Sequence, residues 1–110
     1  AGELKHGTLA LIEEGTPVIV TASQNHLLDK TTSNVQEVIA RGAYVIAIGD
    51  RESEKLENIS NDYVILPDSN EILTTVISII PLQFIAYHVA NKNGQSIDQP
   101  RNLAKSVTVE

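Results

Sequence analysis

Three short apolar runs, each rich in valine and isoleucine, constrain the fold of this chain more than any other feature of its sequence. They are PVIVTA at residues 17–22, YVIAIGD at 44–50 and YVILP at 63–67. The runs are nearly continuous rather than alternating, which is typical of parallel strands buried on both faces of a sheet. The pattern therefore predicts three buried parallel strands.

The segment between the first two runs favours a helix. Leu28, Val35, Val38 and Ile39 share one face at helical spacing, and Gly42 stands where a helix C-terminus is expected. The polar stretch RESEKLENISND that follows the second run predicts either a short helix or a loop. A strand, helix, strand order of this kind predicts a doubly wound α/β fold with a parallel sheet.

The apolar segment after the third run predicts one long helix. Ser69 or Asn70 can cap its start, and Asn93-Gly94 ends it. Pro81 should kink this helix, because proline cannot donate a hydrogen bond to the carbonyl of Ile77. The polar residues along the segment favour a buried helix over a membrane span.

The composition of the chain limits the classes of function and partner that it can have. The chain has 110 residues, 42% of them hydrophobic, and a formal net charge of −6. The hydrophobic content predicts a globular domain, and the acidic balance argues against nucleic acid and anionic membranes as partners. Because cysteine is absent and only three histidines are present, we expect no disulfide, metal or other cofactor. The lack of disulfides fits a cytoplasmic protein.

Two polar segments follow predicted strands, where ligands bind in open α/β sheets. In TASQN, Thr21 and Ser23 could hold a phosphate, but the segment has no glycine-rich loop and an ordinary helix cap at Ser23 or Asn25 is favoured. In GDRE, Asp50 could bind a ribose hydroxyl, but the sequence contains no GxGxxG motif and a plain turn is favoured.

A few titratable residues could carry chemistry. His6, in GELKHG, is a candidate general acid or base. His26 is expected to be exposed at the start of a helix, and His88 is expected to be a structural or partly buried polar residue of the long helix. Lys105 lies at the centre of the irregular tail, four residues after Arg101 and among small or apolar neighbours. Such surroundings suit an activated lysine nucleophile and also an ordinary surface lysine.

The stretches AGELKHG, LALIEEGTPVIV and DQPRNLAKSVTVE closely resemble the glutamine–fructose-6-phosphate aminotransferase (isomerising) family. The resemblance covers the whole chain and implies a three-layer α-β-α fold with a parallel flavodoxin-like sheet. Residues 1–94 would form the second sugar-isomerase (SIS) subdomain, truncated at its N-terminus, so that its sheet is incomplete. Residues 95–110 would form an irregular C-terminal tail that carries the active-site lysine.

The resemblance also implies roles for three residues. Lys105, in NLAKS, would form a Schiff base with the C2 ketone of fructose 6-phosphate, and the adjacent Ala104 would contact the sugar. His6 would assist opening of the sugar ring, at the site of the neighbouring subunit of a homodimer. The product would be glucosamine 6-phosphate, made with glutamine-derived ammonia in the first step of hexosamine synthesis.

Other parts of the family's machinery are not matched in this sequence. The glutamate that moves the proton between C1 and C2 precedes AGELKHG in the family, and the phosphate loop and the glutaminase belong to other domains. We therefore expect a piece of a longer chain, inactive alone, whose partners include the rest of its own polypeptide. The alternative is a regulatory SIS-type module that binds sugar phosphates without chemistry.

Overall fold

The computed structural model describes residues 2–99 of the chain. The protein consists of two compact units, Ala1–Ile79 and Ile80–Glu110. The predicted roles of Lys105, Ala104 and Arg101 fall outside the described residues. The predicted boundary at residue 94 between a subdomain and a tail is a functional division, and it stays a prediction.

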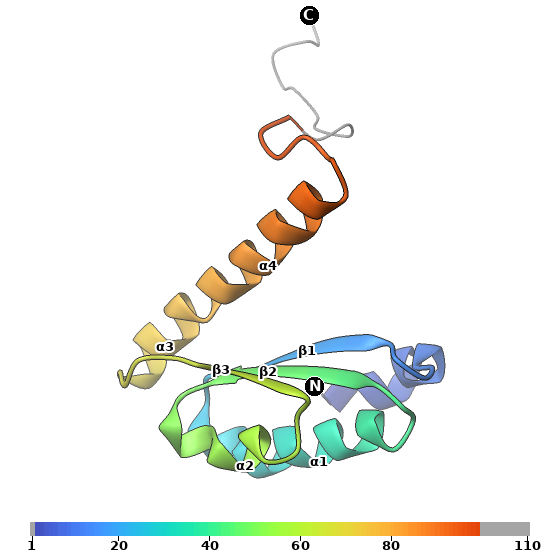
Figure 1. Ribbon diagram of the computed structural model, residues 1–110. Coiled ribbons are helices and arrows are strands. Elements are labelled where there is room, and N and C mark those ends of the chain that lie inside the picture. Colours follow the sequence, from blue (N-terminus) through green and yellow to red (C-terminus); the bar gives the residue numbers. More distant parts are fainter. Residues whose placement is uncertain (1, 100–110) are drawn as a thin grey trace, which may run out of the picture. The chain divides into compact units, whose positions relative to one another are not determined.

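A three-stranded parallel sheet forms the centre of the first unit (Figure 1). Its strands are β1 (Pro17–Ala22), β2 (Tyr44–Gly49) and β3 (Asp62–Ile65), in the order β1-β2-β3. β1 pairs with β2 from Pro17 opposite Tyr44 to Ala22 opposite Gly49. The three predicted strands and their parallel arrangement are confirmed, and with them the α/β class.

Helices α1 (Leu28–Ile39) and α2 (Glu54–Glu57) lie along one face of this sheet (Figure 1). Val35 and Val38 of α1 and Leu56 of α2 are buried against Val45 and Ala47 of the central strand. The apolar face predicted for residues 28–39 is therefore the one that packs on the sheet. The polar stretch at 51–62 forms the short α2 after a single turn of 3₁₀-helix, η4 (Arg51–Ser53).

Burial on both faces, predicted for all three runs, is wrong for β3, where Ile65 is 58% exposed, and also for β1. Its residues alternate: Val18 and Val20 pack against the core, whereas Ile19 on the opposite face is 41% exposed. The central strand β2 fits the prediction better, since Val45, Ala47 and Ile48 are all fully buried. A continuous apolar run indicates that two faces need cover, but the cover has to come from other segments.

Gly42 ends α1 in a left-handed conformation, with φ 88°. Its N–H donates to the Ile39 carbonyl at 2.9 Å, and the Ala43 N–H donates to the Val38 carbonyl at 3.1 Å. The predicted C-terminal glycine is confirmed. A Cβ at this position would lie 2.9 Å from the Cα of Glu14, so a side chain would add a steric clash to the strain of a positive φ.

We expect Gly42→Ala to lower the free energy of unfolding by about 1–3 kcal/mol. Gly15→Ala is the matched control, because Gly15 has a similar φ of 79° but nothing within 4 Å of the added Cβ. Urea unfolding measures both variants. Equal losses in the two would show that backbone strain alone, and not contact with Glu14, requires glycine at residue 42.

The predicted long helix is divided into α3 (Glu71–Ile77) and α4 (Ile79–Lys92). Asn70 caps α3 as predicted, accepting a hydrogen bond from the Leu73 N–H at 3.0 Å. The interruption falls where Pro81 cannot donate to the Ile77 carbonyl, as its sequence position predicts. Gly94, with φ 64°, follows the end of α4, which confirms the predicted stop.

The expectation that this helix is buried is wrong within the described residues. No residue of α4 is buried, and Phe84, Tyr87 and Val89 are each about half exposed or more. Within Glu71–Lys92, a segment of 18 residues has a mean hydropathy of 1.7 and is 11% buried, so the stretch is long and apolar enough to cross a membrane. Length and composition do not separate a membrane span from a core helix whose cover comes from elsewhere.

Candidate functional site

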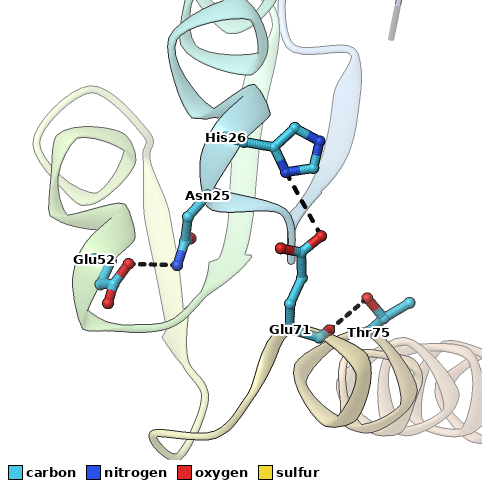
Figure 2. Close-up of polar contacts among 5 residues, drawn as sticks. All are labelled: Asn25, His26, Glu52, Glu71 and Thr75. Carbon is cyan, nitrogen blue, oxygen red and sulfur yellow. Dashed lines mark hydrogen bonds and ion pairs between the residues drawn. The ribbon is translucent and has the colours of Figure 1, made fainter.

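Polar side chains from the three segments that follow the strands meet beyond the carboxyl ends of the sheet (Figure 2). Asn25 lies in η3 (Asn25–Leu27), after β1, and its amide donates a hydrogen bond to the carboxylate of Glu52, which follows β2. The next residue, His26, places Nδ1 3.6 Å from Oε1 of Glu71, at the start of α3. These contacts join the segments that follow all three strands.

The contact between His26 and Glu71 lies at the surface, with side chains 62% and 48% exposed. Ion pairs in such surroundings contribute about 0–1 kcal/mol at most. The exposure predicted for His26 is therefore confirmed. The predicted cap at Ser23 or Asn25 is wrong, because Gln24 precedes η3 and makes no side-chain capping bond. The Asn25 side chain is engaged with Glu52 instead.

Asp50 is buried, and its side chain stabilises the turn after β2. Its carboxylate accepts hydrogen bonds from the Glu52 N–H at 3.0 Å and from Ser53 Oγ at 3.2 Å. The Tyr63 hydroxyl donates to the Asp50 backbone carbonyl at 2.6 Å, and burial raises the pKa of this phenol. The favoured prediction of a plain turn is confirmed, because the carboxylate is committed to its own loop.

A groove of about 770 Å³ runs between β1 and α1. Thr21, Ser23 and Gln24 line it at the carboxyl end of β1, and Lys5 and Lys30 also border it. Hydroxyls and ammonium groups can bind an anion, but several apolar side chains of β1 and α1 line the same groove. Phosphate binding by Thr21 and Ser23 therefore stays a prediction.

The segment that contains His6 is held against the same helix. It forms two turns of 3₁₀-helix, η1 (Gly2–His6) and η2 (Thr8–Leu11), whose Leu4 and Leu9 pack against the core. Lys5 Nζ lies 2.6 Å from Oε1 of Glu37 in α1. The imidazole of His6 is exposed, and within residues 2–99 it has no hydrogen bond or ion pair. It is accessible to a group from outside this unit.

His88 lies in α4, within the second unit. Its ring centroid is 6.4 Å from that of Phe84 in a stacked arrangement and 5.2 Å from that of Tyr87, edge to face. These ring contacts fit the structural role predicted for His88, but the residue is exposed, so the partial burial that was the alternative is wrong. Within residues 2–99 no group of three or more histidine, aspartate or glutamate side chains is arranged to hold a metal ion.

Three carboxylates that the sequence analysis did not single out shape the first unit: Glu37, Glu52 and Asp62. Asp62 accepts a hydrogen bond from the Tyr44 hydroxyl at 2.7 Å, across the pair of strands β2 and β3. Each of these contacts joins residues far apart in the chain, so no local sequence pattern predicts it. The pairing of the parallel strands, together with the packing of η1 and α1 on the core, brings the partners together.

The bond between Tyr44 and Asp62 predicts a pH dependence. The carboxylate of Asp62 accepts a hydrogen bond from the neutral phenol and repels a phenolate, and both effects raise the pKa of Tyr44 above its usual value. The folded form then holds its proton more tightly than the unfolded form, whose pKa is about 10. The stabilisation is complete below that pKa and is lost as the pH rises through the higher pKa of the folded state.

We therefore expect Tyr44→Phe to lower the urea midpoint at pH 7 and to flatten its decline above about pH 10. Tyr87→Phe is the control, because within the described residues that phenol makes no hydrogen bond. An unchanged decline above pH 10 in Tyr44→Phe would contradict this assignment.

The parallel sheet, the helices on its face and the polar loops at the strand ends define an α/β domain of the open-sheet class. Residues 1–91 match the sequence model of the SIS domain family. The chain belongs to the SIS domain family.

Solved and curated proteins agree with this assignment. The chain is 51% identical over 110 residues to the glutamine–fructose-6-phosphate aminotransferase [isomerizing] of Caldanaerobacter subterraneus subsp. tengcongensis, and 49% identical to that of Thermus thermophilus. A solved structure, the C-terminal domain of glucosamine-fructose-6-phosphate aminotransferase from Francisella tularensis, matches with a TM-score of 0.77 and 39% identity. That match covers 90% of this chain and 28% of the solved one.

The chain spans 18% of the length of the two curated relatives, while all of its own residues are matched. The resemblance stated from AGELKHG and RNLAKSVTVE is confirmed: this sequence matches the aminotransferase family in its C-terminal, SIS-domain region.

Proposed function

We propose that this chain is the C-terminal part of an isomerase that makes glucosamine 6-phosphate from fructose 6-phosphate and glutamine-derived ammonia. The observation that carries the proposal is the 51% identity to a glutamine–fructose-6-phosphate aminotransferase along the full 110 residues. The alignment covers the whole chain, and therefore also the segments that contain His6 and Lys105.

In this proposal Lys105 is the nucleophile and forms an imine with the C2 ketone of the open-chain sugar. Ala104 contacts the sugar beside it, and His6 transfers a proton when the ring opens. The described residues support the role of His6 in one respect, because its imidazole is exposed and makes no bond within its own unit. It is thus available to a sugar bound by a neighbouring subunit.

The partners are the rest of the enzyme and a second copy of it. The face of β1 that carries Ile19 is open, and the α4 side chains of Phe84 and Tyr87 are exposed. Apolar surfaces of this kind are normally covered in a complete protein. We propose that other segments of the parent enzyme cover them, that the enzyme is a homodimer, and that it works in the cytoplasm.

The test uses the natural gene product that encodes this sequence, purified and supplied with glutamine and fructose 6-phosphate. Glucosamine 6-phosphate should form and should be detected by mass spectrometry, whereas the 110-residue chain alone should form none. A gene product that binds sugar phosphates but forms no amino sugar would instead support a regulatory SIS module.

A further inference from the structure

We propose that Glu37 is a positioning residue for His6, acting through its ion pair with Lys5. The inference rests on the proposed function, because it assigns His6 to proton transfer at the sugar. Glu37 lies in α1, 31 positions after His6 in the printed sequence, and no motif links the two. The structure brings them together through the residue that precedes His6.

The contact itself is short and partly shielded. Lys5 Nζ and Glu37 Oε1 are 2.6 Å apart, and the side chains of Lys5 and Glu37 are 52% and 30% exposed. It is the shortest of the four contacts between basic and acidic side chains found in residues 2–99, and in the other three both side chains are about half exposed or more. A shielded charge pair of this geometry is stronger than a fully solvated one.

The anchor of Glu37 is rigid. Its helix, α1, packs on the sheet through Val35 and Val38, which are 2% and 1% exposed. The segment η1 is different: it is a single short run of 3₁₀-helix with poorer hydrogen-bond geometry. Its remaining contacts to the unit include the packing of Leu4 on the core and a 3.3 Å bond from Thr8 Oγ1 to the Leu4 carbonyl. The ion pair therefore fixes the end of η1 where His6 lies.

Geometry explains why fixing Lys5 also directs His6. Successive residues of a 3₁₀-helix are about 120° apart around its axis. When Lys5 is held toward α1, His6 must project away from that helix, and its imidazole is indeed exposed. Glu37 touches neither the sugar nor His6 in this arrangement. It sets the direction in which the imidazole is presented.

The test is a double-mutant cycle in the natural gene product, with kcat/KM for fructose 6-phosphate as the readout. Glu37→Gln keeps the size of the side chain and removes its charge, and we expect about a tenfold loss. In the His6→Ala background the same change should cost less than about twofold, because no imidazole is left to position. The charge reversal Lys5→Glu with Glu37→Lys should recover part of the loss.

Asp29→Asn is the matched control. Asp29 also lies in α1 and pairs with a lysine, Lys55, at 3.1 Å, but this pair does not involve η1. It should leave kcat/KM unchanged. A tenfold loss from Glu37→Gln in both the wild-type and His6→Ala backgrounds, or no loss in either, overturns the proposal.

Hydrogen exchange separates this proposal from the proposed function. In the gene product, Glu37→Gln should speed exchange of the amides of residues 4–11, and Asp29→Asn should not. If the wild-type protein forms no amino sugar, the proposed function fails. Faster exchange would then still support the tether of η1, and unchanged exchange would overturn the tether as well.

Discussion

Replacing Lys105 by arginine in the natural gene product is expected to abolish glucosamine 6-phosphate formation, by about 10³-fold or more, while glutamine hydrolysis continues. The proton transfer between C1 and C2 of the sugar requires that the negative charge that develops beside C2 is stabilised. A protonated imine at C2 provides this stabilisation. The attacking amine must be neutral, and at an ordinary lysine pKa only about one in 2,500 is neutral at pH 7. Arginine keeps the positive charge but does not deprotonate, so it cannot form the imine.

Borohydride trapping gives the direct measurement. Reduction in the presence of fructose 6-phosphate should leave a stable adduct on the C-terminal peptide of the wild-type enzyme and none in Lys105→Arg. Lys55→Arg is the matched control, because Lys55 lies in α2 and arginine can keep its ion pair with Asp29. An adduct on another lysine, or no adduct in an active enzyme, would refute the assignment of Lys105.

The second large effect is expected at His6. Opening the hemiketal ring requires proton transfer between the ring oxygen and the hydroxyl, and a positioned imidazole contributes about 10²–10⁴-fold to such a step. His6→Ala should therefore slow amino-sugar formation by about this factor, and glutamine hydrolysis should be nearly unaffected. Because His6 is exposed and makes no bond within residues 2–99, its removal should not lower the stability of its own unit.

Both activities should be measured on the same preparation, together with the midpoint of thermal unfolding. Equal loss of sugar isomerisation and glutamine hydrolysis, or a clearly lowered unfolding midpoint, would indicate a folding defect. The role of His6 in the chemistry would then have to be abandoned. The variant leaves the pair between Lys5 and Glu37 in place, so it removes the imidazole without releasing η1.

The elements of the fold were predictable from short-range patterns. Valine and isoleucine runs predicted β1, β2 and β3, and Gly42 and Asn70 marked helix ends through backbone conformation and capping. These signals are local, because strand propensity, glycine at positive φ and side-chain caps each depend on a few neighbouring residues. Pro81 belongs to the same group, since its missing N–H acts on a carbonyl four residues away.

Burial was predicted less well, for a physical reason. The runs at β1 and α4 show that these segments are apolar enough to need cover on more than one side, yet Ile19 and Phe84 are exposed in the described structure. Hydrophobicity specifies that a surface is better removed from water. It does not specify which segment removes it, or whether that segment lies within these 110 residues.

The sequence by itself determined the α/β class, the parallel sheet and, through the motifs around His6 and Lys105, the family. Only the tertiary structure decided which polar and charged side chains meet: Lys5 with Glu37, Asn25 with Glu52, and His26 with Glu71. These partners are separated by long stretches of chain, and an isolated charge carries no information about its partner. They are brought within reach by the pairing of parallel strands and the packing of α1 on the sheet, which arise only when the whole unit folds.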